Sequence, residues 1–358
     1  MRLGEPTQTI PLPGNPRPLI VIGAGGIVRD AHLPAYSKVG FEVAGIYDVV
    51  EARAQEVATE FRIPRVFRSL AEAVEKAPAR AVFDVAVPAS AILEVLPALP
   101  DGSGVLIQKP MGENLAQARS IREFCHRKRL VAAVNFQLRY APYVLAARDL
   151  IDQGAIGKVH DMEIRLTAYT PWHLWTFFTK LPRVEILYHS IHYLDLTRAF
   201  LGEPRGIYAK TLRHPRASNL ASTRSAMIID YDDVLRATVT TNHWHEFGQR
   251  HQESYIKWEG TSGAIVATMG LLLNYPRGVP DELEYCALDG GAAPHWQRIA
   301  LQGSWFPDAF GGIMANLQRF LEGTCTELET NVDDAYKTMA LVEGAYISSA
   351  QGGVPIPQ

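Results

Sequence analysis

The feature that most constrains the fold of this chain is a short apolar run that ends in glycines. Residues 18–22, PLIVI, lead directly into Gly23-Ala-Gly25, and a helical pattern follows. A buried strand that passes through glycines into a helix is typical of dinucleotide-binding folds. Gly23 allows the tight turn, and Gly25 lets the backbone approach a pyrophosphate at the helix N-terminus. Val28 occupies the position where a third Gly or Ala is usual, so the motif alone is a weak indication.

A second predicted strand supports a dinucleotide site. Residues 41–47, FEVAGIY, end at Asp48, which lies about 20 residues past the glycines, where an acid binds the adenosine ribose hydroxyls. An acid at this position repels a 2′-phosphate, so we expect NAD in preference to NADP. The alternative role for Asp48 is to cap the helix that is predicted to start near Val50.

Strands and helices alternate up to residue 134, which implies a parallel sheet covered on both faces, with ligands at the carboxyl ends of its strands. Further strands are predicted over residues 81–87, 104–107 and 130–134, and helices over 89–99 and 113–129. Lys109 lies at one strand end, and the proline after it restricts its backbone, which an ordinary surface lysine does not need. The residues expected to contact the dinucleotide are Gly23, Gly25, Gly26, Ile27, Val28, Asp48, Val87, Pro88, Gln108, Lys109 and Asn135.

A polar stripe on a predicted helix is the second feature with chemical content. On a helix over residues 183–195, at ~3.6 residues per turn, one stripe combines carboxylates, a phenol and imidazoles. Such a stripe can move protons near neutral pH or hold a metal. The alternative is a polar helix face that happens to be rich in histidine. The stripe consists of Glu185, Tyr188, His189, His192 and Asp195.

Aromatic and histidine residues elsewhere are candidates to meet this helix. The dense aromatic stretch of residues 170–178 lies in a predicted loop and suits the CH faces of a sugar, with a hydrophobic plug or an oligomer contact as the alternative. His243 and His245 close a predicted strand with both imidazoles on the same face. Nothing in the histidine spacing enforces a zinc site, so we expect no metal. The residues expected to contact the substrate are Arg139, Trp172, His173, Trp175, His189 and His245.

Composition limits the partners and the compartment. The net charge of −3 argues against a nucleic-acid or anionic-membrane partner. No apolar run approaches the ~20 residues of a membrane span, and the Pro-rich N-terminus lacks the apolar core of a signal peptide. Three cysteines, odd in number and without a CxxC pair, fit a reducing compartment. We therefore expect a cytoplasmic protein.

The second half of the chain is predicted to form a separate domain built on a sheet. Its β-rich segments are residues 159–169, 206–212, 225–231, 234–241 and 253–258, with a helix over 184–201 packed on one side. The expected fold class is α/β. We expect residues 1–137 to form a Rossmann NAD-binding domain, with residues 1–17 as a Pro-rich tail. We expect residues 138–358 to form the substrate domain, whose last helices (312–321 and 332–349) return to the first domain.

Several motifs follow one another along nearly the whole chain. They are Gly23-Ala-Gly25, Asp48, the Gln-Lys-Pro of 108–110, Asn135-Phe-Gln-Leu-Arg139-Tyr-Ala-Pro142, Ile156-Gly-Lys-Val159 and Trp258-Glu-Gly-Thr-x-Gly263. Together they resemble the glucose–fructose oxidoreductase / inositol dehydrogenase (Gfo/Idh/MocA) family, more through their order and spacing than through any one motif. The resemblance implies an open, mainly antiparallel sheet in the second domain, whose outer face makes oligomer contacts, and hence a homodimer or homotetramer.

The resemblance also implies a catalytic group. In sugar and inositol dehydrogenases of the family, it is formed by the lysine of the Lys-Pro motif with the first Asp and the His of an Asp-x-x-x-His-x-x-Asp segment. Lys109, His192 and Asp195 match positions of these motifs. Tyr188 stands where the first Asp is usual, and Gln108 stands where Glu is common. Both departures fall in the chemical centre.

We expect hydride transfer between NAD and a secondary hydroxyl or ketone of a sugar, a cyclitol or a derivative. Neutral His192 would take the hydroxyl proton, while Lys109 orients the hydroxyl and stabilises the alkoxide. Tyr188 would relay a proton, and Glu185 would replace the charge of the missing Asp; packing and a surface ion pair are the respective alternatives. A redox-assisted glycosidase or lyase, and a non-catalytic dinucleotide-binding sensor or co-regulator, are the alternative functions.

Overall fold

The computed structural model describes residues 4–288 and 293–357, which fall into two compact units. The first, which we call the nucleotide unit, comprises Thr9–Ala141 and Phe306–Met339. The second, the sheet unit, comprises the described residues within Met1–Gln8, Pro142–Trp305 and Ala340–Gln358. The boundary that we expected after residue 137 thus falls after residue 141, and residues 1–3 of the predicted tail lie outside the described residues.

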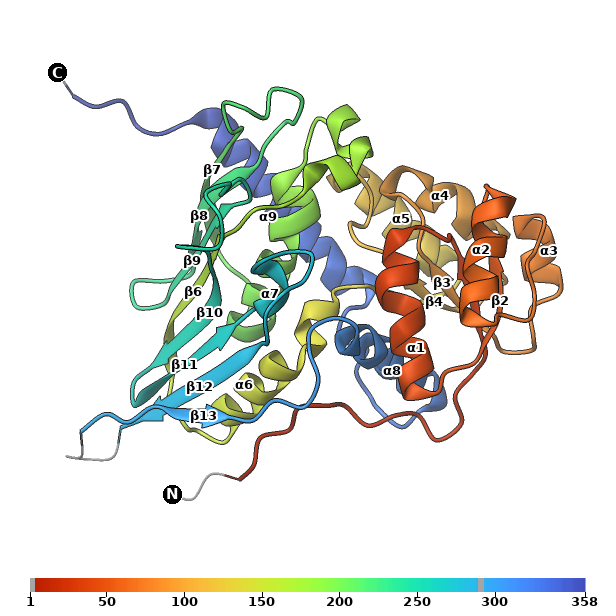
Figure 1. Cartoon of the computed structure of the whole chain (residues 1–358), viewed down its shortest axis with the longest axis horizontal. Helices are drawn as coiled ribbons and strands as arrows, with labels where there is room; N and C mark the ends of the chain where they lie inside the picture. The colour runs from red at the N-terminus through yellow and green to blue at the C-terminus, as the bar shows by residue number, and fades with distance from the viewer. Residues whose placement is uncertain (1–3, 289–292, 358) are drawn as a thin grey trace. The chain divides into compact units, whose positions relative to one another are not determined.

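The nucleotide unit is built on a parallel sheet. Its strands are β1 (Leu19–Ile22), β2 (Val43–Tyr47), β3 (Val82–Val85), β4 (Gly104–Ile107) and β5 (Val131–Val134). Its helices include α1 (Leu33–Val39), α2 (Glu51–Phe61), α3 (Leu70–Glu75), α4 (Ile92–Val95), α5 (Leu115–Arg127) and α8 (Asp308–Glu322) (Figure 1). Every residue of β1, β3 and β4 is buried, as in a sheet covered by helices on both faces. The predicted Rossmann-type α/β fold is confirmed.

The strand order of this sheet creates a switch point beside β1. Within the described residues the order is β2-β1-β3-β4-β5, so the chain leaves β1 for one side and returns to its other side. In sheets of this order, ligands bind at the switch point, outside the carboxyl ends of the strands. Val21 of β1 pairs in register with Asp84 of β3, and the glycines that follow β1 lie at that end.

The predicted N-terminal tail is held by hydrogen bonds in each unit. In the nucleotide unit, the backbone amides of Gly14 and Asn15 donate to the carboxylate of Glu322 in α8. In the sheet unit, the backbone amide of Thr7 donates to the carboxylate of Asp149. These segments therefore belong to the fold of their units.

The sheet unit contains a larger sheet of mixed direction. Its strands are β6 (Val159–Thr167), β7 (Gly206–Leu212), β8 (Arg224–Asp230), β9 (Arg236–Asn242), β10 (Glu253–Gly260), β11 (Gly263–Thr268), β12 (Glu282–Ala287) and β13 (Gln297–Ile299). Among the described residues, their order is β13-β12-β11-β10-β6-β9-β8-β7, and β6 with β9 is the one parallel pair. The predicted mainly antiparallel sheet is confirmed, although the sequence pattern predicts none of β11, β12 and β13.

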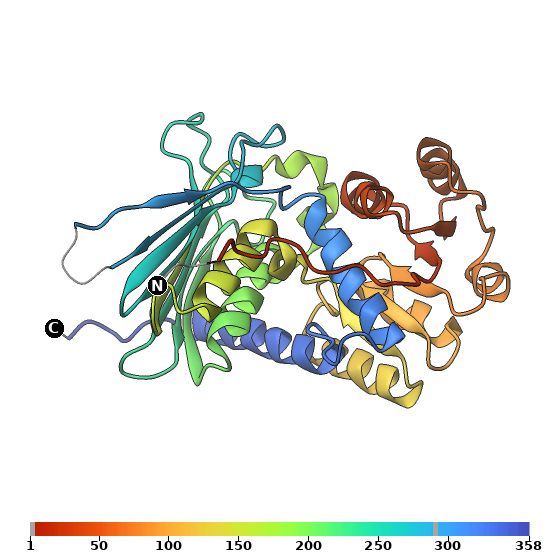
Figure 2. The same ribbon diagram turned by 90° about the horizontal axis from the view of Figure 1, so that it is seen from below.

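Helices cover one face of this sheet. α6 (Pro142–Asp152) contacts β11 and β12, α7 (Ile191–Leu201) contacts β9, and both helices lie against the same face (Figure 2). Met227 and Ile229 of β8 are buried accordingly, whereas Ile228 between them is 53% exposed. The last helix, α9 (Val332–Gln351), starts in the nucleotide unit and ends in the sheet unit. Among the described residues, no helix combines the length and the apolar composition that crossing a bilayer requires.

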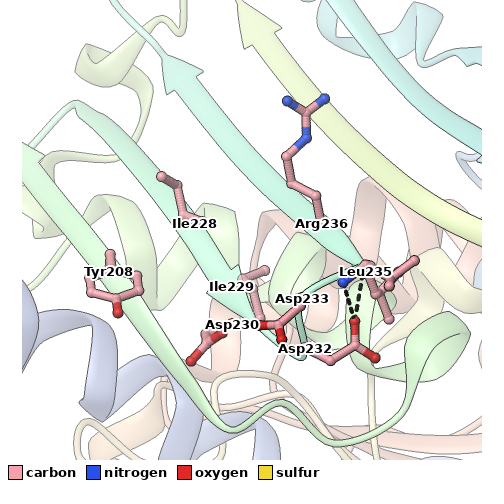
Figure 3. Close-up of a pocket in the computed structure, with 9 residues that line it drawn as sticks. Tyr208, Ile228, Ile229, Asp230, Asp232, Asp233, Leu235 and Arg236 are labelled. Atoms are coloured by element: carbon pink, nitrogen blue, oxygen red, sulfur yellow. Dashed lines mark hydrogen bonds between the residues drawn. The ribbon is translucent and has the colours of Figure 1, made fainter.

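A small hollow lies at the turn between β8 and β9. Figure 3 shows Tyr208 and Ile228 on neighbouring strands, beside the turn that carries Asp232. The backbone amides of Leu235 and Val234 donate to the Asp232 carboxylate, and these bonds lower its pKa and close the turn. Within the part of the chain that the structure describes, the lining of this hollow includes none of the predicted site residues.

Candidate active site

The glycine-rich turn after β1 has the shape that a dinucleotide needs. Gly23 has a φ of +108°, and a Cβ at this position would lie 2.3 Å from the carbonyl oxygen of Ala86. Only glycine fits there. At Gly25, in contrast, a Cβ would meet nothing within 4 Å. The open space beside the Gly25 backbone gives a pyrophosphate room to approach, so the turn fits a dinucleotide.

Asp48, directly after β2, connects the glycine-rich turn to the next helix. Its Oδ2 accepts a hydrogen bond from the Ala24 amide at 2.7 Å, and its Oδ1 accepts one from the Val50 amide at 2.8 Å. The second bond closes a turn just before α2, but Asp48 does not cap that helix: its N-cap residue is Val50, and among the described residues no side chain accepts a hydrogen bond from its first turn. A carboxylate offers about four acceptor positions, and the Ala24 and Val50 amides use two of them. The Asp48 carboxylate could therefore still accept a ribose hydroxyl, and this contact stays a prediction.

The remaining predicted contacts of the turn and of β3 differ in exposure. Gly26 and Pro88 are exposed, and Ile27 and Val87 are half-buried, so each presents some surface to a ligand. Val28 is fully buried and belongs to the core of the unit.

Lys109 lies just beyond the carboxyl end of β4, and Gln108 bonds back to it. The side-chain oxygen of Gln108 accepts a hydrogen bond from the Lys109 backbone amide at 3.2 Å. Desolvation by burial lowers the pKa of the Lys109 ammonium group from 10.5 to about 8. A lysine with this pKa can bind and release a proton near neutral pH, unlike an ordinary surface lysine.

Two predicted contacts in the nucleotide unit point into the protein instead. Asn135, after β5, is fully buried, and its Nδ2 lies 3.1 Å from Nε2 of His32. Arg139 is also buried, and its Nη2 donates to the carboxylate of Asp334 at 2.6 Å. The structure therefore does not support direct dinucleotide contact for Asn135 or substrate contact for Arg139, because both side chains are enclosed by other groups.

The nucleotide unit also contains a buried polar group that the sequence analysis missed. Asp84, within β3, receives a hydrogen bond on Oδ2 from the Tyr36 hydroxyl at 2.8 Å, and Nδ1 of His32 lies 2.7 Å from the same oxygen. All three side chains are fully buried. Burial, followed by the negative charge of Asp84, raises the pKa of Tyr36 well above its ordinary value, so the phenol keeps its proton. A carboxylate within an apolar strand is the sequence signal that points to such a group.

In the sheet unit, the helix predicted over residues 183–195 begins with a wide turn. A π-helical turn, η7 (Ile186–Ser190), precedes α7. Because a π-turn bonds residue i to i+5, it holds one residue more than an α-turn and rotates the helix that follows. Glu185 and Ser190, five residues apart, therefore meet: Ser190 Oγ donates to Glu185 Oε1 at 2.5 Å. The stripe predicted to run from Glu185 to His192 is wrong for this reason.

Glu185 is fully buried and uses its charge inside the unit. Its carboxylate accepts a hydrogen bond from Ser225, and Nε2 of His243 lies 3.4 Å from its Oε1. Burial raises the pKa of Glu185, but the His243, Ser190 and Ser225 contacts outweigh burial and hold the pKa below its usual value. The carboxylate is therefore ionised and engaged by His243, and not by His192 as we expected.

The aromatic stretch forms a small core. Trp172 is 6% exposed and packs with Phe178, while its ring lies edge-on to His189 and His243 at centroid distances of 5.1 and 5.9 Å. The hydrophobic-plug alternative is thus what the structure shows for Trp172. Tyr188 also packs edge-on against Phe178, with centroids 5.2 Å apart, which matches the packing alternative.

The other predicted contacts of the sheet unit are more open. His173 is exposed, and Trp175 is half-buried, with its ring centroid 5.9 Å from that of Tyr275. His245 bonds through Nε2 to the carbonyl oxygen of Arg250 at 2.9 Å. Within residues 4–288 and 293–357, no group of three or more histidine, cysteine, aspartate or glutamate side chains is arranged to hold a metal ion.

His192, in the first turn of α7, packs on a residue that the sequence analysis missed. Its ring and that of Trp305 are edge to face, with centroids 6.2 Å apart. The backbone amide of Trp305 donates to Asp281 at 3.0 Å, and burial raises the pKa of that carboxyl group. These residues are far apart in the chain, so no sequence spacing could have connected them.

Two family models match the chain, one in each half. A model described as "Oxidoreductase family, NAD-binding Rossmann fold" matches residues 18–136. A model described as "GFO/IDH/MocA C-terminal domain" matches residues 144–266. Together they account for most of the chain.

Individual relatives are similar over nearly their full length. A D-apiose dehydrogenase from Paraburkholderia graminis is 24% identical, over 93% of this chain and 87% of the relative. The solved structure of an oxidoreductase from Agrobacterium radiobacter, in complex with NAD+, L-tartaric acid and magnesium, has a TM-score of 0.79 at 21% identity and covers 95% of this chain and 98% of that chain. The solved structure of a levoglucosan dehydrogenase, in complex with NADH and levoglucosan, has a TM-score of 0.78 at 18% identity. It covers 96% of this chain and 100% of that chain. These structures establish the fold.

Proposed function

Because the chain belongs to the Gfo/Idh/MocA family of NAD-binding oxidoreductases, we propose that it transfers hydride between NAD and a secondary hydroxyl or ketone of a sugar, a cyclitol or a derivative of one. The family gives the enzyme class and the cofactor, and the substrate is the proposed part. The names of two relatives, D-apiose dehydrogenase and levoglucosan dehydrogenase, support a small sugar-type substrate.

The position of Lys109 carries the proposal: it lies just beyond the carboxyl end of β4, at the edge of the sheet where ligands bind, and desolvation by burial lowers its pKa to about 8. Oxidising a secondary alcohol requires a group that takes the hydroxyl proton while hydride leaves. NAD supplies the hydride acceptor when it is bound. A desolvated lysine suits the proton-accepting role, because burial disfavours its charged form. We therefore assign proton transfer to Lys109, in place of the orienting role expected from the sequence.

Gln108 supports this assignment. A glutamate, common at this position in the family, would add a negative charge next to Lys109 and raise the lysine pKa. The neutral amide of Gln108 adds no charge, and its oxygen is bonded to the Lys109 backbone. The departure from the family pattern is thus compatible with a lysine that works as a base.

His192 is the second residue that we assign to the reaction. It is 7% exposed and its ring packs edge-on against Trp305, so its orientation is restricted. We assign it a hydrogen bond to the substrate oxygen, which orients the hydroxyl for proton and hydride transfer. His173 and Trp175 are the residues of the aromatic stretch that we keep as substrate contacts.

The test is NADH formation, followed by nicotinamide absorbance, with a panel of aldoses, polyols and anhydrosugars. Wild type is compared with Lys109→Ala and with Lys76→Ala, which removes a lysine that is largely exposed and paired with Glu72. Wild type and Lys76→Ala should turn over at least one member of the panel. Lys109→Ala should be slower by about 10²–10⁴-fold, the usual contribution of a general base.

Three outcomes change the proposal in different ways. NAD binding without turnover of any panel member overturns the dehydrogenase proposal. Equal rates for wild type and Lys109→Ala overturn the role of Lys109 but leave the class intact. Turnover without added NAD, by protein that retains nucleotide through purification, supports the redox-assisted glycosidase or lyase.

We further propose a homodimer or homotetramer that forms through the face of the sheet that carries Ile228. Tyr208 is 66% exposed and Ile228 is 53% exposed, and both border the hollow in Figure 3. Neighbouring apolar side chains on a surface mark interaction sites. Light scattering should give an oligomeric mass for wild type and a smaller mass for Ile228→Lys. A monomeric wild type overturns this part of the proposal.

We also propose a cytoplasmic location. The three cysteines, all within the described residues, are free, which supports a reducing compartment. Fractionation of the source cells tests the location, and recovery from an oxidising compartment contradicts it.

A further inference from the structure

The helix that follows the glycine-rich turn begins with a wide turn. Residues Val28–His32 form a π-helical turn, η1, before α1. The backbone amides of Val28 and Arg29 both donate to the carbonyl oxygen of Gly25, at 3.0 and 3.2 Å. The wide turn is therefore bonded directly to the residue beside which a pyrophosphate has room.

The wide turn begins at Val28. A Gly or Ala at this position of the fingerprint lets the helix pack closely on the preceding strand. Val28 is larger, and it is fully buried. The turn that starts at this side chain holds one residue more than an α-turn.

His32, the last residue of η1, attaches the wide turn to the sheet. Its Nδ1 lies 2.7 Å from Oδ2 of Asp84, and its Nε2 lies 3.1 Å from Nδ2 of Asn135. Nδ1 of His32 thus faces the Asp84 carboxylate and Nε2 faces the Asn135 carboxamide, so both ring nitrogens are engaged.

These contacts connect the helix start, which follows β1, to the strands on the far side of the switch point. Asp84 lies in β3, which pairs directly with β1, and Asn135 follows β5. The His32 ring also packs on Phe310 of α8, with centroids 5.0 Å apart. A fully enclosed ring with two directional bonds has one orientation, so it fixes the turn that carries it.

The buried group formed by His32, Asp84 and Asn135 lowers the stability of the fold. Within the described residues, Oδ1 of Asp84 and Oδ1 of Asn135 are buried without a hydrogen-bond partner. Leaving buried acceptors unsatisfied costs free energy, and an apolar pair would avoid that cost. Stability alone therefore does not explain why these residues stand at the start of the dinucleotide helix.

We propose that His32 is a positioning residue for the dinucleotide. By fixing η1 to Asp84 and Asn135, it holds the backbone from Gly25 to Val28 in the arrangement that binds the pyrophosphate. His32 acts on cofactor binding alone, so its role does not depend on the substrate proposed above.

The test measures the Kd of NADH by nicotinamide fluorescence and the Kd of ADP-ribose, which has the pyrophosphate but lacks the nicotinamide. His32→Leu removes both ring bonds. Tyr36→Phe is the matched control, because it removes one hydrogen bond from the same Asp84 oxygen and leaves η1 attached. His32→Gln is the rescue variant, since its carboxamide retains one donor and one acceptor.

His32→Leu should raise the Kd of both NADH and ADP-ribose by about tenfold or more, equal to roughly 1.4 kcal/mol. Tyr36→Phe should lower the Tm while both Kd values stay within about twofold of wild type. His32→Gln should recover most of the affinity. Loss of ADP-ribose binding places the effect in the part of the cofactor that contains the pyrophosphate, and not at the nicotinamide.

Two results would overturn the proposal. One is a folded His32→Leu variant that binds NADH and ADP-ribose as tightly as wild type. The other is an equal loss of affinity in Tyr36→Phe, because affinity would then follow the stability of the core. If His32→Leu does not fold, Asn135→Ala, which removes the second ring bond, is judged by the same two criteria.

Discussion

Nε2 of His243 lies 3.4 Å from Oε1 of Glu185, and both side chains are closed off from solvent. Nδ1 of His243 lies 2.9 Å from the hydroxyl oxygen of Thr170, at the start of the aromatic stretch. The pair therefore joins three parts of the sheet unit: the wide turn η7, the end of β9 and the aromatic stretch. An ionised carboxylate stays buried only while such partners remain.

Removal of the Glu185 charge should destabilise the protein. Glu185→Gln is expected to lower the free energy of unfolding by about 3 kcal/mol or more, because it removes the charged acceptor on which a buried network of hydrogen-bonding groups converges. Glu253→Gln is the control: it breaks an exposed pair with Arg165 and should cost less than about 1 kcal/mol. Urea unfolding measures both. The effects of Glu185→Gln and His243→Gln should not add in the double variant, and additivity would show that the two residues do not act as a pair.

The same carboxylate should make the protein sensitive to acid. The pKa of Glu185 in the folded state is below the ordinary glutamate value of 4.5, so the folded state holds its charge more strongly than the unfolded chain does. This stabilisation is present above the unfolded pKa and is lost as the pH falls through the lower folded pKa. The free energy of unfolding of wild type should therefore fall more steeply with acid than that of Glu185→Gln. Urea unfolding at a series of pH values measures both proteins, and the same dependence of the unfolding free energy on pH in both would contradict the prediction.

Lys109 should set the pH dependence of oxidation. If the neutral amine accepts the proton, kcat/KM rises with pH and levels off above about 8. Lys109→Arg keeps the positive charge but cannot act as a base, so kcat should fall by about 10²–10⁴-fold while NAD still binds. A fully active Lys109→Arg would show that charge alone is sufficient at this position.

The Lys109 pKa can also be checked without a substrate. Because the pKa of Lys109 is about 8 in the folded state, against 10.5 for an ordinary lysine, the unfolded chain binds more protons between these pH values. The contribution of Lys109 to stability should therefore become more favourable as the pH rises from about 8 to 10.5. Lys109→Met should remove this part of the pH dependence. If the free energy of unfolding of wild type and of Lys109→Met changed equally with pH over this range, the lowered pKa of Lys109 would be contradicted.

Asp48 should contribute to the choice between NAD and NADP. Asp48→Asn retains an acceptor for the Ala24 amide but loses the negative charge that opposes a 2′-phosphate. The ratio of the NADPH Kd to the NADH Kd should therefore fall by about tenfold, roughly 1.4 kcal/mol. Arg53→Ala, which removes an exposed cation 3.6 Å from Asp48, is the control for a general change of charge. An unchanged ratio in Asp48→Asn would refute the role.

Substitution of Trp172 and of its neighbour His173 by alanine should change the stability of the protein by very different amounts. Trp172→Ala removes a buried ring from the small aromatic core and should cost about 3–5 kcal/mol of stability. His173→Ala changes an exposed side chain and should stay within about 0.5 kcal/mol of wild type. Thermal unfolding separates the two. A stable Trp172→Ala with a raised KM would favour the substrate contact that the burial of Trp172 argues against.

The nucleotide unit could be predicted from the sequence because its signals are local. The apolar run of residues 18–22, the glycines and the alternation of strands and helices each describe a few neighbouring residues. In the sheet unit, β12 and β13 carry a mixture of charged and apolar residues that gives no clear period. Their pairing depends on partners elsewhere in the chain, which single-sequence patterns do not contain.

The site could be predicted only in part, and the failures have specific causes. The stripe on residues 183–195 assumed a constant helical period, and one additional residue in η7 turned Glu185 toward Ser190. The partners Ser225 and His243 come from distant strands. Asp84 is different, because a carboxylate within an apolar strand does indicate a buried partner, although it does not identify His32.

β6 and β9 are parallel neighbours, so the chain between them must cross back over the sheet. That crossover contains the aromatic stretch, η7 and α7. The two strands cannot pair until the crossover is compact, which makes their pairing a long-range and slow event in folding. Substitutions at Trp172 or His189 should consequently change how fast the protein reaches its native state, and a low yield of folded protein must be separated from a loss of chemistry.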